Sequence, residues 1–166
     1  MNLNLAKLLV IAGIIVSLLS SGHPSAAIIG LVLYLVGMYG LASYYEQSEI
    51  LRYALISTVG FLAGVVVAVL VMGLGSIFAG LLAGPPGFGT AIIAGLVLLY
   101  ISMLAMGYYR RRLMEILARY GDEGLARLTG KLYWYGAILT IIIIGFIVLL
   151  IASILELVVV ATLRSR

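Results

Sequence analysis

Five apolar runs fill most of this 166-residue chain, and between them lie only short polar segments. A helix needs roughly 20 apolar residues to cross the hydrocarbon core of a bilayer, and only the first run falls short of that length. Lipid offers the backbone no hydrogen-bond partners and the sequence shows no barrel-like alternation, so each run is predicted to be helical. The runs are about Leu5 to Ser20, Ala26 to Tyr45, Tyr53 to Ala83, Thr90 to Tyr109, and Leu132 to Leu163.

The composition supports a membrane protein. Hydrophobic residues make up 64% of the chain and charged residues 10%, whereas soluble domains average roughly 45–50% apolar and about 25% charged residues. A soluble domain of this length has too little interior to bury that much apolar surface. The chain is therefore predicted to be polytopic.

Part of the sequence occurs twice. Both copies begin after a proline turn, continue as an apolar stretch, and end with a tyrosine pair and a Glu-Ile-Leu…Arg-Tyr signature. Since each copy holds two spans, both have the same orientation, which predicts a parallel repeat. The matching segments are 27–34 with 91–100, 44–45 with 108–109, and 49–53 with 115–120.

The predicted fold class is all-α: a polytopic membrane helix bundle of five transmembrane helices in a single integral membrane domain, 1–166. The two hairpins of the repeat cover about 5–53 and 54–120. A basic cytoplasmic loop over 110–131 then carries a short juxtamembrane helix, and a fifth helix covers 132–163.

Charge placement orients this bundle. Eight basic residues fall on one side, whereas the opposite loops at 21–25 and 84–89 carry neither Lys nor Arg. Only Arg164 and Arg166 disagree with that bias. Under the positive-inside rule the N-terminus is expected to be cytoplasmic and the C-terminus external. The eight residues are Lys7, Arg52, Arg110, Arg111, Arg112, Arg119, Arg127 and Lys131.

The basic loop has two interpretations. Its apolar face and its i,i+4 charge pairs favour a helical extension that enforces topology, with a stop at Gly121 and a second helix capped by Asp122. The alternative is contact with anionic lipid headgroups. The candidate residues for that contact are Arg110, Arg111, Arg112 and Arg119.

Glu156 is the one acidic residue inside a long apolar run. An acid in such a position is by default a functional candidate. About twenty residues after Lys131, however, the fifth helix should already have reached the far interface. Glu156 is therefore expected near the external headgroups, with a structural role.

Several kinds of chemistry have no support in the sequence. The chain has no cysteine, and His23 is its one histidine, so no metal-ligand set is apparent. No nucleophile, base or metal cluster predicts catalysis, and no cofactor is expected. The small basic surface comes with no nucleic-acid recognition fold.

Two stretches carry a family resemblance: Gly37 to Tyr45 followed by Ile50, and Thr129 to Thr140 running into Ile144-Gly145-Phe146. They resemble a family of small prokaryotic, mainly archaeal, integral membrane proteins, domain of unknown function family 996. The resemblance implies a multi-pass protein in the cell membrane of an archaeon. It implies no activity, ligand or site residue.

The leading functional hypothesis is a non-enzymatic structural or accessory component of a membrane assembly. It rests on the absence of intramembrane charge and the many small residues available for helix packing. The alternative is a small oligomeric transporter or channel built from parallel hairpin repeats, and a weaker one is a membrane protein that interacts with anionic lipids. The expected partners are membrane lipids, with other membrane proteins or further copies of the chain.

Overall fold

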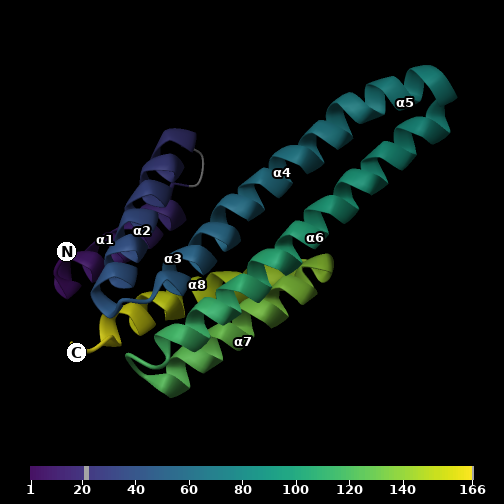
Figure 1. Cartoon of the computed structure of the whole chain (residues 1–166). Helices are drawn as coiled ribbons and strands as arrows, with labels where there is room; N and C mark the ends of the chain where they lie inside the picture. The colour runs from purple at the N-terminus through teal and green to yellow at the C-terminus, as the bar shows by residue number, and fades with distance from the viewer. Residues whose placement is uncertain (21–22, 166) are drawn as a thin grey trace.

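The protein is an all-α helix bundle (Figure 1). The computed structural model describes residues 1–20 and 23–165, and no strand occurs among them. Ser21, Gly22 and Arg166 lie outside the described residues, so the expectations for the 21–25 loop and for Arg166 are only partly addressed. The helices are α1 (Leu3–Leu19), α2 (Pro24–Tyr45), α3 (Ser48–Leu55), α4 (Phe61–Leu70), α5 (Ser76–Ala83), α6 (Pro85–Leu117), α7 (Glu123–Leu139) and α8 (Ile144–Thr162).

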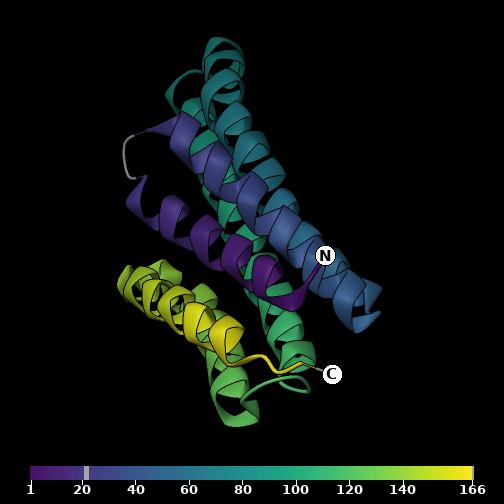
Figure 2. The ribbon, with the colours of Figure 1, turned by 90° about the vertical axis from the view of Figure 1, so that its left-hand side faces the viewer.

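The helices form three hairpins: α1 with α2, the α3–α5 rod with α6, and α7 with α8. Two π-helical turns, η1 (Ile56–Gly60) and η2 (Val71–Gly75), join α3, α4 and α5 into one continuous rod. This rod and α6 form a hairpin that extends well beyond the other two in Figure 1. α1 packs against both α2 and α8, which Figure 2 shows on either side of it.

Small residues allow α1 and α2 to approach closely. A Cβ atom at Gly13 would lie 2.7 Å from the carbonyl oxygen of Gly30, and one at Gly30 would lie 2.8 Å from the backbone nitrogen of Ser17. Such backbone contact is typical of membrane helix pairs. Because the hydrophobic effect does not drive helices together in lipid, they associate through close packing, which small side chains permit.

Four helical segments within the described residues are long and apolar enough to cross a membrane: Ser25–Tyr45, Ser48–Ala83, Pro85–Leu117 and Ile144–Thr162. The apolar helix α1 is shorter. The prediction of an all-α membrane bundle is therefore confirmed at the level of fold class.

The predicted single fifth helix over 132–163 is wrong. The chain reverses at η3 (Thr140–Ile142) and at Ile143, which has a positive φ of 65°, and α8 then returns alongside α7. The reversal requires Gly145, because a Cβ there would overlap the backbone of Thr140 and of Gly136. Thr140 Oγ1 donates to the Gly136 carbonyl at 2.8 Å. The turn is otherwise built from isoleucines, so it carries no polar signal in the sequence.

Both chain ends consequently lie at one end of the molecule, here called the base, with the α2–α3 and α6–α7 turns (Figure 1). The Lys7 ammonium donates to the carbonyl of Ala161 at 3.2 Å and also to that of Leu163. Tyr45 donates to the carbonyl of Arg164 at 2.7 Å. The two described chain ends therefore lie near each other, whereas the sequence predicted them on opposite sides of the membrane, because α8 reverses the direction of the chain once more.

The turn between α6 and α7 also differs from expectation. α6 continues without a break from Pro85 to Leu117, so the predicted short juxtamembrane helix is the last part of this long helix. The predicted cap is confirmed: Asp122 Oδ1 accepts from the backbone N–H of Leu125 at 2.9 Å. α7 starts there and extends to Leu139, well past the predicted basic loop.

Tyrosines at the base contact one another across the two copies of the repeat. Tyr45 stacks on Tyr120 with ring centroids 4.0 Å apart, and Tyr53 stacks on Tyr109 at 6.1 Å. In the repeat, Tyr45 corresponds to Tyr109 and Tyr53 to Tyr120. The contacts are therefore reciprocal, as two units related by a two-fold axis would make them.

Candidate functional site

A buried ion pair joins α6 to α8. Arg110 Nη1 lies 2.7 Å from each carboxylate oxygen of Glu156, and the two side chains are only 15% and 1% exposed. Both residues belong to helices apolar and long enough to span a membrane. At 1.5 Å per residue, each lies about 10 Å from the base-side end of its helix. An unpaired charge at this depth would be costly, so each side chain depends on the other.

Two tyrosines complete this group, which we call the polar centre (Arg110, Glu156, Tyr34 and Tyr133). Arg110 Nη1 donates to the Tyr34 hydroxyl at 2.6 Å, and that hydroxyl donates to Glu156 Oε1 at 3.0 Å. Tyr133 donates to the other carboxylate oxygen of Glu156. The Arg110 guanidinium also lies over the tyrosine rings, 4.7 Å from the Tyr34 centroid and 5.4 Å from that of Tyr133, within cation–π range.

The polar centre takes one residue from each of four helices and joins all three hairpins. Tyr34 comes from α2, Arg110 from α6, Tyr133 from α7 and Glu156 from α8. Tyr34 and Glu156 stand among aliphatic residues of their helices, whereas Arg110 follows two tyrosines and Tyr133 precedes a tryptophan. The three hairpins therefore meet through hydrogen bonds and charge.

A cavity of about 120 Å³ opens beside the polar centre. Its lining includes all four members of the centre together with the hydroxyls of Ser17, Thr58 and Ser153. Two buried polar atoms of the described residues, Arg110 Nε and Thr58 Oγ1, have no hydrogen-bond partner. Because buried polar groups in proteins are almost always paired, these two indicate a place for a polar guest.

The π-helical turn η1 places Thr58 at this cavity. The turn interrupts the ordinary hydrogen-bond ladder between α3 and α4. Such single π turns inside α-helices occur frequently at functional sites. The neighbouring Ser57 is buried and donates to its own helix, to the carbonyl of Ala54 at 3.0 Å.

The arrangement offers hydrogen bonding to a small guest. Among the described residues, no group of three or more His, Cys, Asp or Glu side chains is placed to hold a metal ion. The charges of Arg110 and Glu156 cancel, so the centre is neutral as a whole. It presents the buried N–H donor of Arg110 Nε and several hydroxyls that can donate or accept.

The structure separates the four arginines that the sequence grouped as a lipid-contact patch. Arg110 points inward to Glu156, whereas Arg111, Arg112 and Arg119 are exposed at the base. Arg111 and Arg112 both pair with Glu115, at 3.0 and 3.2 Å. Arg110 therefore does not belong to a headgroup patch.

Glu156 was expected near the external headgroups, and this placement is wrong. It is almost fully buried against Arg110, toward the base. The error follows from the missed reversal at Thr140–Ile143, which turns α8 back toward Arg110. The position of Glu156 fits the general rule that an acid inside an apolar run is a functional candidate, rather than the structural role expected from the sequence.

Sequence reasoning did not assign Tyr34, Tyr133 or Thr58 to a site. Tyr34 closes the first apolar segment of the repeat, and Tyr133 lies in a cluster of aromatic residues of the kind found at membrane interfaces. The usable signal was a phenol in the middle of a run of aliphatic residues, at Tyr34. Nothing in the sequence pairs it with Glu156, 122 positions later.

The fold and the site define a multi-pass helical membrane protein with a buried ion pair. The chain belongs to the family described as Protein of unknown function (DUF996), whose model matches residues 26–154. It is 29% identical over 163 residues to the Uncharacterized protein MJ1644 of Methanocaldococcus jannaschii, covering 95% of this chain and 91% of that protein. No solved structure matches the chain.

Proposed function

We propose that this protein is a small, non-enzymatic membrane transport protein and that its solute binds at the polar centre. The observation that carries the proposal is the cavity of about 120 Å³ in which Arg110 Nε and Thr58 Oγ1 lack partners. Ionisable residues inside membrane helices are costly and typically mark solute or proton pathways. The same ion pair removes the main argument for a purely structural role, which was the absence of intramembrane charge.

The size and charge of the cavity limit the solute. A volume of about 120 Å³ holds about four water molecules at about 30 Å³ each. Arg110 and Glu156 neutralise each other, so an uncharged solute with hydrogen-bonding groups fits without a change of charge. An anion would fit if Glu156 took up a proton, because Arg110 would then need a new counter-ion.

In this proposal a movement of the hairpins opens the route to the centre. The three hairpins meet there through Tyr34, Tyr133 and the ion pair. Rocking one hairpin against the others would exchange these hydrogen bonds for bonds to a solute. Movement of one repeat unit against another around a fixed site is the usual mechanism in transporters built from repeats.

We place the base on the cytoplasmic side of an archaeal cell membrane. The base includes Lys7 and the basic residues of the α6–α7 region. It also includes Arg164, whose backbone N–H donates to the Tyr120 carbonyl at 2.8 Å. An exception to the positive-inside rule is thereby removed. Both chain ends are cytoplasmic in this proposal.

The test is transport by purified protein in liposomes. Osmotic swelling with glycerol and with urea, and proton flux reported by an enclosed pH dye, sample the solute classes that the cavity admits. We expect at least one flux to exceed that of protein-free liposomes and to be lost in Glu156→Gln. The matched control Glu115→Gln removes a partly exposed carboxylate from α6 and should keep the flux. Fluxes equal to those of empty liposomes for all three probes would overturn the proposal.

A second candidate is an accessory role in a membrane assembly, and the long hairpin favours it. Its outer part leaves Leu81 and Leu82 79% and 88% exposed, and Gly73 has no atom within 4 Å of a Cβ position. Such small-residue apolar surface suits packing against other membrane helices. The test is a pull-down of the protein in mild detergent, followed by size-exclusion chromatography. A strictly monomeric protein without partners would count against the accessory role.

A further inference from the structure

A second hollow lies at the base, between the end of α6 and the start of α7. This cleft has a volume of about 700 Å³ and is separate from the polar centre. Arg111 and Arg119 line it from the α6 side, and Arg127 and Lys131 from α7. Glu115 and Glu123 are the acidic residues of its lining, so its net charge is +4 − 2 = +2.

The two carboxylates in the cleft already have partners. Glu115 pairs with Arg111 at 3.0 Å, and Glu123 pairs with Arg127 at 2.5 Å. Arg119 and Lys131 make no ion pair within the described part of the chain, although both line the cleft. Two cationic side chains on opposite walls are thus available for an anion.

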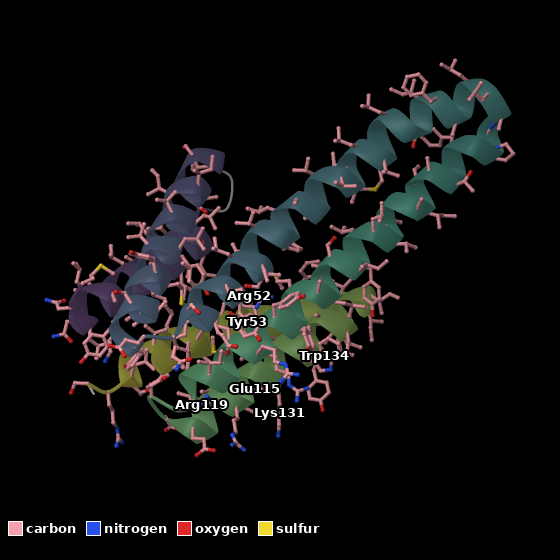
Figure 3. The ribbon with its side chains drawn as sticks, in the orientation of Figure 1. Arg52, Tyr53, Glu115, Arg119, Lys131 and Trp134 are labelled. Carbon is pink, nitrogen blue, oxygen red and sulfur yellow. The ribbon has the colours of Figure 1, made fainter. Side chains whose placement is uncertain are left out.

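Aromatic residues of the kind that gather at membrane interfaces lie close to the residues that line the cleft. Trp134 lies one helical turn after Lys131, and its ring contacts that of Tyr108 edge to face, with centroids 6.2 Å apart. Tryptophan and tyrosine gather at membrane–water interfaces. Figure 3 shows Arg119, Glu115, Lys131 and Trp134 along the same side of the α6–α7 region.

We infer that this cleft binds the phosphate group of an anionic membrane lipid, with Arg119 and Lys131 as the direct contacts. A phosphate oxygen suits both the planar guanidinium of Arg119 and the ammonium of Lys131. A lipid is favoured over soluble phosphate because the cleft lies beside the aromatic belt, where headgroups are concentrated. The inference does not depend on transport at the polar centre.

The experiment compares two charge-matched double variants by native mass spectrometry of the full-length protein. Arg119→Gln/Lys131→Gln removes both available cations of the cleft. Arg52→Gln/Arg112→Gln removes two exposed cations outside its lining. The titrants are phosphatidylglycerol and, as a neutral reference, phosphatidylcholine. A third series adds inorganic phosphate to the phosphatidylglycerol titration at constant ionic strength.

We expect the wild type to prefer phosphatidylglycerol at least about tenfold, and Arg119→Gln/Lys131→Gln to lose most of that preference while the control retains it. Equal losses in the two variants would mean diffuse charge attraction and would overturn the site. Displacement of the lipid by millimolar inorganic phosphate would overturn the lipid assignment in favour of a soluble phosphate.

Discussion

The base and the tip of the long hairpin are built on different principles. At the base, Tyr45 and Leu117 are fully buried, and side chains of α1, α2 and α6 donate hydrogen bonds to α8 and to the segment after it. At the tip, α5 and the start of α6 leave large apolar side chains such as Leu81, Leu82 and Phe88 exposed. The tip is therefore mostly exposed apolar surface, whereas polar contacts at the base join several helices.

The largest loss of stability is expected when the ion pair of Arg110 and Glu156 is broken. Glu156→Leu leaves Arg110 buried without a counter-ion, and breaking one side of such a pair typically costs about 3–5 kcal/mol of stability. Thermal unfolding in mild detergent measures it, with the exposed Leu81→Ala at the tip as control. The double variant Arg110→Leu/Glu156→Leu should recover much of the loss. Additive losses in the double variant would show that the two charges do not interact.

Glycine substitutions should next separate the close-packed α1–α2 pair from the long hairpin. Gly13→Ala places a methyl group against the backbone of α2 and is expected to cost about 1–3 kcal/mol through overpacking. Gly73→Ala meets open space and should be neutral or stabilising by up to about 1 kcal/mol, because alanine favours helix. Unfolding midpoints compare the pair directly. Equal effects would contradict the close α1–α2 contact.

A smaller effect is expected at the chain ends. Tyr45→Phe keeps the stack on Tyr120 but removes the hydrogen bond to the Arg164 carbonyl, at an expected cost of about 1 kcal/mol. Tyr39→Phe is the control, since Tyr39 is 61% exposed. Denaturant or thermal unfolding measures the change in stability of the two variants. Proteolysis of the C-terminal tail should accelerate only in the Tyr45 variant.

The smallest effect is expected at an exposed pair of the base. Arg127 and Glu123 are 66% and 64% exposed, and surface pairs contribute about 0–1 kcal/mol. Arg127→Gln should leave the unfolding midpoint nearly unchanged. A loss as large as that of Glu156→Leu would mean that exposure does not distinguish the two ion pairs.

The sequence predicts the bundle well and the site poorly, for a physical reason. Apolar runs and a capping aspartate at Asp122 are local signals, so most helices follow from them. The reversal before Gly145 is made by isoleucines and a close backbone contact, and apolar turns of this kind carry no polar mark. Because that reversal sets where Glu156 lies, the pairing with Arg110 could not be predicted without it.

Two residues of the polar centre nevertheless stand out in the sequence. Glu156 stood out as a charge within an apolar run, and Arg110 as the first of three consecutive arginines. Their opposite charges make them natural partners, but 46 residues separate them. The contacts of Tyr34 and Thr58 depend on how the hairpins assemble, which residue patterns along the chain do not encode.

The reversal of α8 is the central claim, because it creates the polar centre. The chain has no cysteine, so Asn4→Cys/Ser165→Cys introduces one spin label near each chain end. Pulsed electron resonance of the labelled protein in liposomes measures the distance between them. We expect a distance well below the roughly 30 Å thickness of the bilayer core. A distance of about 30 Å or more would place the ends on opposite sides and contradict the pairing of Arg110 with Glu156.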